Sequence, residues 1–170
     1  MENVEALIRP ATRHDLKSIL EIYNEAVLNT TASADYEPQT LAQRVLWFES
    51  RKKMGFPMYL AEAPGGRVVG WASLSPYHTR PGYRFTAENS VYIAADWRGR
   101  GIGKQLMIRV IESAKVLRLH AIVASIEATS EASIRLHVSL GFEQRGHLRE
   151  LIYKFDRWLD VVYMELVLDA

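Results

Sequence analysis

One short segment limits the folds open to this chain more than any other: residues 96–104, which read DWRGRGIGK. It stands between residues 86–94, where Val91 and Ile93 alternate as in a strand, and residues 101–117, whose apolar side chains recur at helical spacing. Glycines let a backbone approach an anion closely, and a helix that begins there offers free N–H groups and the positive end of its dipole. Residues 98–118 also hold six basic side chains against one acidic side chain. The sequence therefore predicts a strand–loop–helix unit that binds a polyanionic cofactor; a basic helix start without a ligand is the alternative.

The other elements alternate irregularly along the chain. Thr40 and Gln43 have the spacing of a capping box, and Pro64-Gly65-Gly66 predicts the turn of a hairpin. Strand patterns cover residues 4–9, 58–63, 67–74, 86–94, 121–126, 142–153 and 159–168, and helical patterns cover residues 16–27, 40–48, 101–117 and 131–140. This order predicts a mixed α/β (α+β) layer structure and excludes a TIM barrel or a regular doubly wound sheet.

Composition excludes several classes of protein. A chain of 170 residues predicts one domain, residues 1–170. The net charge of +1 argues against nucleic-acid binding and against attraction to an anionic membrane. The lack of cysteine excludes disulfides, thiolate nucleophiles and Cys-ligated zinc. The acidic start, MENVE, and the absence of an apolar run of about 20 residues predict a soluble, cytoplasmic protein.

Three phosphate-binding patterns compete for residues 96–104, which we call the glycine segment. A P-loop requires glycine where Arg98 stands and a hydroxyl residue where Gln105 stands, and a dinucleotide fingerprint requires a different glycine spacing. The third pattern, Arg/Gln-x-x-Gly-x-Gly/Ala, is met by Arg98, Gly101 and Gly103. It resembles the pyrophosphate loop of the GNAT superfamily of acyl-coenzyme A-dependent N-acyltransferases.

A second stretch supports this resemblance. Residues 133–142 (SIRLHVSLGF) resemble the closing helix and the Gly-Phe strand entry of the superfamily, with His137 where Tyr is commoner. Relatives often carry Asn in the preceding turn, where Thr129 and Ser130 stand here. The resemblance implies a mixed central sheet splayed between its fourth and fifth strands and flanked by four helices.

Three further stretches point to one branch of the superfamily. Residues 37–40 (EPQT), 86–93 (TAENSVYI) and 154–160 (KFDRWLD) resemble phosphinothricin acetyltransferases and methionine sulfoximine/methionine sulfone acetyltransferases, and the similarity runs from about Leu7 to about Leu168. The resemblance implies acetyl-CoA as acyl donor, a small amino-acid-like acceptor and a homodimer. The apolar residues 161–168 are candidates for pairing with a second subunit.

The resemblance also implies roles for individual residues. Glu88 would be the general base that frees the acceptor amine; the alternative is a structural ion pair with Arg80 or Arg84. His137 would stabilise the tetrahedral intermediate or protonate the leaving sulfur, unless it is only a hydrogen-bonded helix histidine. The expected acetyl-CoA contacts are Val91, Tyr92, Ile93, Arg98, Gly99, Arg100, Gly101, Ile102, Gly103, Lys104, Ser130 and Ser133, and the expected substrate contacts are Tyr36, Arg80, Tyr83, Arg84 and Lys154.

No metal is expected, because the remaining histidines have no ligand spacing. Trp47, Trp71, Trp97 and Trp158 are expected to fill the core or an interface. Two other functions stay open: acetylation of another amine, such as a protein N-terminus or a polyamine, and binding of acyl-CoA without catalysis. A polyamine would favour an acidic pocket, whereas residues 79–85 offer Arg80 and Arg84 and no acidic side chain.

Overall fold

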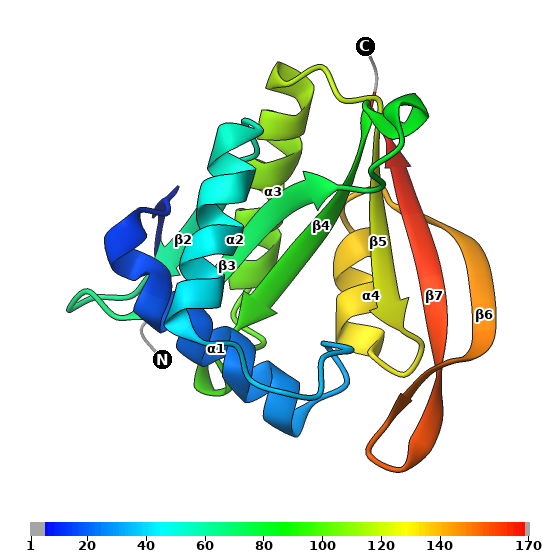
Figure 1. Ribbon diagram of the computed structural model, residues 1–170, viewed down its shortest axis with the longest axis horizontal. Coiled ribbons are helices and arrows are strands. Elements are labelled where there is room, and N and C mark those ends of the chain that lie inside the picture. The colour runs from blue at the N-terminus through cyan, green and yellow to red at the C-terminus, as the bar shows by residue number, and fades with distance from the viewer. Residues whose placement is uncertain (1–5, 169–170) are drawn as a thin grey trace.

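The computed structural model describes residues 6–168, which form one seven-stranded sheet with helices on both faces (Figure 1). The strands are β1 (Leu7–Pro10), β2 (Met58–Glu62), β3 (Val68–Pro76), β4 (Thr86–Ile93), β5 (Ala121–Glu127), β6 (Glu143–Lys154) and β7 (Arg157–Val167). The helices are α1 (Leu16–Asn29), α2 (Leu41–Lys53), α3 (Ile102–Val116) and α4 (Glu131–Val138). The element order agrees with the sequence prediction, although residues 4 and 5 of the first predicted strand lie outside the described residues.

The spatial order of the strands is β1-β2-β3-β4-β5-β7-β6, and within the described residues only β4 and β5 run parallel. This pairing joins only Thr86, Ala87 and Glu88 to residues of β5. Beyond Glu88 the two strands diverge, and in Figure 1 α4 lies in the angle between them. The sheet is therefore mixed and splayed between its fourth and fifth strands, as the resemblance implied.

Local sequence explains where the helices begin. Thr40 caps α2 through the predicted capping box, accepting from Gln43 N–H at 3.3 Å while the Gln43 side chain accepts from Thr40 N–H at 2.8 Å. The helical pattern after Thr12 begins with a short 3-10 turn, in which Asp15 accepts from Thr12 N–H at 2.8 Å. Gly101 caps α3 in the left-handed conformation, with φ of 77°.

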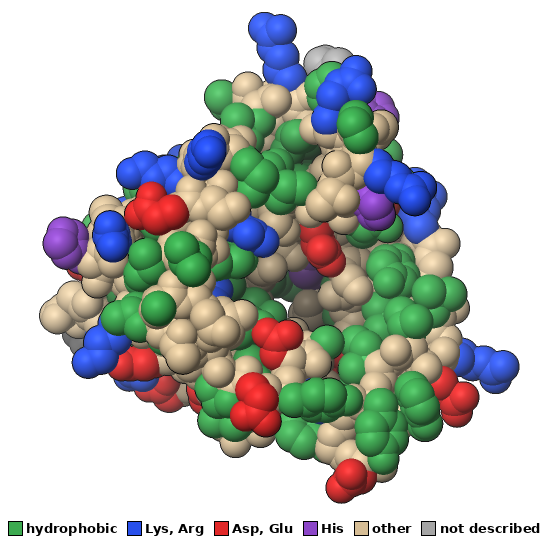
Figure 2. Space-filling view, in the orientation of Figure 1, with side chains coloured by type: hydrophobic (Ala, Val, Ile, Leu, Met, Phe, Trp, Pro, Cys, Tyr) green, Lys and Arg blue, Asp and Glu red, His purple; other side chains and the backbone are tan. Residues whose placement is uncertain are grey.

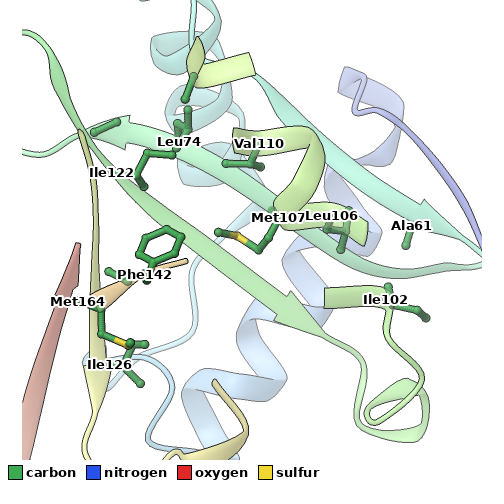
Figure 3. Close-up of a cluster of buried hydrophobic side chains, with 14 of the residues drawn as sticks. Ala61, Leu74, Ile102, Leu106, Met107, Val110, Ile122, Ile126, Phe142 and Met164 are labelled. Atoms are coloured by element: carbon green, nitrogen blue, oxygen red, sulfur yellow. The ribbon is translucent and has the colours of Figure 1, made fainter. Parts of the chain in front are cut away.

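Two clusters of buried side chains cover the two faces of the sheet. One cluster places Leu106, Met107 and Val110 of α3 against Leu74 and Ile122 (Figure 3). The other gathers residues of α1 and α2 around Trp71, which is 1% exposed. These clusters fix β4 and β5 and thereby the opening between them.

One buried charge belongs to the second cluster. The Arg44 guanidinium of α2 lies 4.2 Å from the centre of the Tyr23 ring and 4.6 Å from that of Trp47. Arg44 is 2% exposed and has no carboxylate within 4.0 Å among residues 6–168. Aromatic faces are thus its main electrostatic partners, and its burial lowers its pKa.

The position of β7 corrects one expectation. Residues 161–168 do not form a free edge, because β7 pairs with β5 on one side and with β6 on the other. Val161 and Met164 are each 1% exposed within this chain. A second subunit cannot extend the sheet along β7.

Candidate active site

A cavity of about 320 Å³ occupies the opening between β4 and β5. Figure 2 shows this face of the molecule hollowed near its centre, with acidic side chains close to the opening. Its walls come from β4, β5, the start of α4 and the segment after α1, and they include Glu88, Asn89, Glu127, Ser130, Ser133 and His137. A larger cavity of about 560 Å³ lies between β1 and α3, but its two charged side chains, Arg109 and Glu112, pair with each other at 3.1 Å. The cavity between β4 and β5 brings a carboxylate, Glu88, and an imidazole, His137, to one space.

The splay exposes backbone donors of β4 in this cavity. Alternate residues of an antiparallel strand direct their backbone groups to the same neighbour. The Ala94 N–H donates to the Val69 carbonyl of β3 at 2.9 Å, and the β3–β4 register is unbroken, so Tyr92 also faces β3. Of the three predicted donors, Val91 and Ile93 therefore direct their N–H groups into the opening, toward a ligand placed there.

Glu88 lies at the point where the two strands separate. Its side chain is partly buried, and burial raises the pKa of its carboxyl group. No cation lies within 4.0 Å of its carboxylate among residues 6–168, so the predicted alternative, an ion pair with Arg80 or Arg84, is not formed. A carboxylate with a raised pKa and no cationic partner is suited to accept a proton near neutral pH.

His137 projects from α4 and is only 1% exposed. Its Nδ1 lies 2.8 Å from the Ser133 carbonyl, which can only accept, so Nδ1 carries the proton. Its Nε2 then accepts from the Asn89 amide at 3.0 Å. Burial lowers the pKa of His137 and keeps the ring neutral. Both ring nitrogens are engaged, which leaves none to donate a proton to a ligand in this arrangement.

The glycine segment follows the end of β4 and leads into α3. Gly99 and Gly101 both have positive φ, 76° and 77°, and the backbone N–H groups of residues 99–104 donate to no backbone carbonyl in the described chain. Gly103 allows α3 to approach α4, because a Cβ at this position would lie 3.2 Å from the Leu136 side chain. The segment thus presents consecutive free amides at a helix N-terminus, the geometry that binds phosphate oxygens.

The basic side chains of this segment are partly committed. Arg98 donates to the Ile93 carbonyl and to Glu25, each at 3.1 Å. Arg100 donates to the Asp96 carbonyl at 3.1 Å and lies over the Trp97 ring. Lys104 is exposed, and its side chain makes no hydrogen bond among residues 6–168. Of the predicted cofactor side chains, Lys104 is thus the freest to meet an anion.

The structure does not gather the predicted substrate residues in the cavity. Arg80, Tyr83 and Arg84 belong to an exposed loop before β4, and none of them lines the cavity. Tyr36 donates to the Tyr153 carbonyl, and Lys154 is 3% exposed, with its ammonium bonded to two backbone carbonyls.

Sequence reasoning missed several polar residues of the cavity. Asn89, Asp35 and Glu127 line the cavity, but only Asn89 lies within a predicted motif, next to Glu88. The Asn89 Oδ1 atom is buried and has no hydrogen-bond partner among residues 6–168, so one acceptor of this side chain is unsatisfied. No sequence signal marked Asp35 or Glu127, because their place depends on the folding of distant segments.

No cluster of three or more His, Asp or Glu side chains within residues 6–168 has the geometry to hold a metal ion. None of the helices in that range is long and apolar enough to cross a membrane.

Comparisons with known proteins agree with this geometry. A family model described as acetyltransferase (GNAT) domain matches residues 8–163. The L-methionine sulfoximine/L-methionine sulfone acetyltransferase of Pseudomonas aeruginosa PAO1 is 45% identical over 98% of this chain and 96% of its own length. A crystal structure of a ribosomal-protein-alanine N-acetyltransferase from Brucella melitensis is 45% identical, with a TM-score of 0.92 over 95% of this chain and 99% of that chain. A GNAT superfamily phosphinothricin acetyltransferase from Sinorhizobium meliloti, solved in complex with AcCoA, is 37% identical, with a TM-score of 0.94 over 96% of this chain and 88% of that chain.

Proposed function

The chain belongs to the GNAT acetyltransferase family, and on that premise we propose that it transfers acetyl from acetyl-CoA to the α-amine of a small amino-acid analogue. Methionine sulfoximine, methionine sulfone and phosphinothricin are the proposed acceptors, because similar proteins carry these names. The observation that carries the proposal is the cavity between β4 and β5, where Glu88 and the free amides of β4 border one space.

The residues of the glycine segment would hold the donor. The amides of residues 99–104 suit a diphosphate, and no side chain crowds Gly101, since a Cβ there would meet nothing within 4 Å. The free edges of β4 and β5 beyond Glu88 suit the amide-bearing arm of coenzyme A. Acetyl-CoA supplies a thioester, an acetyl group already activated for transfer.

Glu88 would accept a proton from the acceptor ammonium, directly or through water, and leave a neutral amine. The amine nitrogen then forms a bond to the acetyl carbon, and the carbon–sulfur bond breaks. The N–H groups of Val91 and Ile93 would stabilise the charge on the carbonyl oxygen during this step. The nitrogen loses its second proton to water as the amide forms, and the departing thiolate takes the proton held by Glu88 or one from solvent.

The contacts of His137 favour the role of a hydrogen-bonded helix histidine over that of a proton donor. With Nδ1–H bonded to Ser133 and Nε2 bonded to Asn89, the ring is a fixed neutral acceptor. We propose that it fixes the orientation of the Asn89 amide.

The acceptor amine is tested with a panel of amines and detection of the free thiol. Transfer to methionine sulfoximine, methionine sulfone or phosphinothricin is expected. The proposal fails if all three stay inert while a peptide with an N-terminal alanine reacts, which is the function that the similarity to the Brucella protein favours. A polyamine belongs in the panel as well, because Asp35, Glu88 and Glu127 make the cavity wall acidic. If acetyl-CoA raises the melting temperature but no amine is acetylated, the chain is a binding module instead.

We further propose a single cytoplasmic domain that forms a homodimer. The chain has no cysteine and so needs no oxidising compartment to form disulfides. Exposed apolar side chains around the β6–β7 hairpin, among them Leu151, Phe155 and Trp158, support a partner copy at this surface. Sedimentation equilibrium of the whole protein tests the dimer, and a mass of 19.4 kDa would refute it.

A further inference from the structure

Residues 30–36, which we call the strap, run from the end of α1 across the mouth of the cavity between β4 and β5. Thr31, Ser33 and Asp35 line the cavity together with Glu88. The strap lies between α1 and α2 and forms neither a helix nor a strand, so it has no regular backbone hydrogen bonds of its own. Its position must therefore come from side chains that bond to it.

One set of bonds attaches the strap to the half of the sheet that carries β4. The Tyr92 hydroxyl of β4 donates to the Ala32 carbonyl at 3.2 Å. The Tyr23 hydroxyl of α1 lies 3.1 Å from Ser33 Oγ and donates to the Asp35 carboxylate at 2.5 Å. These contacts alone would leave the far side of the strap free.

A second set attaches it to the other half, beyond the opening. Thr31 Oγ1 donates to the Glu127 carboxylate of β5 at 2.9 Å. The Lys154 ammonium, at the end of β6, donates to the Thr30 carbonyl at 3.0 Å and to the Ser33 carbonyl at 2.7 Å. The strap thus spans the splay. On the far side Lys154 makes two charge-assisted hydrogen bonds to it and Glu127 makes one, and such bonds are stronger than neutral ones.

Lys154 is poorly placed to bind substrate itself. It is 3% exposed and does not line the cavity, and its ammonium already has two carbonyl partners. We propose that Lys154 is a positioning residue for the acceptor: by holding the strap across the cavity, it fixes Ser33 and Asp35 in the cavity that Glu88 also lines. The inference rests on the proposed function and deepens it, since it assigns the strap to acceptor binding and not to acetyl-CoA binding.

The test compares Lys154→Met, which keeps most of the side-chain length but removes the donors, with wild type. The acceptor KM should rise by about tenfold to a hundredfold, the range for losing hydrogen bonds from a charged group. The Kd of acetyl-CoA, measured by calorimetry, should change by less than about twofold, because the glycine segment lies outside the strap. Arg149→Met is the matched control: Arg149 is an exposed cation of the same strand with no hydrogen bond among residues 6–168, and its loss should change neither constant.

A second comparison separates positioning from direct binding. If Lys154 bound the acceptor carboxylate directly, Lys154→Met would raise the KM of methionine sulfone but not that of its methyl ester. If Lys154 only positions the strap, the KM should rise by the same factor for both acceptors. Thr31→Val, which removes the bond to Glu127, should reproduce the rise in acceptor KM, whereas Thr31→Ser, which keeps a hydroxyl, should restore most of the wild-type value.

Hydrogen exchange gives a readout that does not depend on activity. Amides of residues 30–36 should exchange faster in Lys154→Met than in wild type, while those of α3 should not change. An unchanged acceptor KM, a loss confined to the free acid, or unchanged exchange of the strap would each overturn the inference. If wild type acetylates no amine, the proposed function fails, and strap exchange still decides whether Lys154 holds this segment. If Lys154→Met does not fold, the acceptor KM values of Thr31→Val and Thr31→Ser decide whether the strap positions the acceptor.

Discussion

Replacing Glu88 with Gln removes one charge from the cavity and little else. The two side chains have nearly the same shape, and the Glu88 carboxylate has no ion pair or hydrogen bond among residues 6–168 that Gln would break. The substitution therefore separates proton transfer from packing, and its effects on rate and on stability are predicted to have opposite signs.

Turnover should fall by about 10²–10⁴, the range for losing a general base. At about 1.4 kcal/mol for each factor of ten, this is a rise of about 3–5 kcal/mol in the activation free energy. The acetyl-CoA Kd should stay within about twofold of wild type, because Glu88 faces the acceptor and the amides that suit the diphosphate lie in residues 99–104.

Stability should rise. Burial raises the pKa of Glu88 above its ordinary value of 4.5, so the folded state binds its proton more tightly than the unfolded state does. Wild-type stability is then lost as pH rises from 4.5 through the folded pKa, whereas Glu88→Gln lacks this loss. The variant should be the more stable protein at pH 8, and the difference should close as pH falls toward 4.5.

Stopped assays of thiol release at saturating acetyl-CoA give the rate, and urea unfolding between pH 4.5 and pH 8 gives the stability. A loss of turnover smaller than about threefold would remove Glu88 from the role of base. A variant less stable than wild type at pH 8 would show that the carboxylate has a favourable partner, and the reasoning from an unpaired buried charge would be refuted.

Two further predictions concern buried and strained positions. His137→Gln should make the free energy of unfolding less dependent on pH below 6.5. Burial holds the folded pKa of His137 below 6.5, so wild type loses up to about 1.4 kcal/mol per pH unit as pH falls below that value. Equal slopes of unfolding free energy against pH in the two proteins, measured by urea unfolding, would contradict this. Gly101→Ala, with φ of 77°, should lower stability by about 1 kcal/mol and weaken acetyl-CoA binding in calorimetry. Gly66→Ala, with φ of 84° in the β2–β3 turn, is its control; it should share the strain but leave the Kd unchanged, and equal Kd values for both variants would count against the glycine segment as the diphosphate site.

Local patterns were sufficient to predict most elements of the fold. Thr40 and Gln43 form the capping box that their spacing indicates, and Gly101 adopts the left-handed conformation at the start of α3. Both features depend only on residues within a few positions in the chain. The opening between β4 and β5 was expected only through the family resemblance, because a splay between two parallel strands leaves no local pattern.

Contacts between distant segments could not be predicted in this way. Lys154 was expected to bind substrate, but it bonds to carbonyls more than 100 residues earlier in the chain. The bond between His137 and Asn89 joins α4 to β4 and depends on the packing of both. Arg44 showed no sequence sign of burial, since an aromatic cage replaces the acidic partner that a buried arginine usually has.

The outer edges of the sheet have a consequence for how copies of this protein can meet. On one side β1 has four residues and ends at Pro10, which lacks a backbone donor. On the other side the pairing of β6 with β7 is interrupted between Leu148 and Ile152, where Glu150 has φ of 52°. A short strand and a kinked one are poor templates for a foreign strand, so continuous cross-molecule sheets, the route to fibrils, are disfavoured at both ends. We therefore expect copies that associate to do so through side chains, which lets them separate again without breaking a shared sheet.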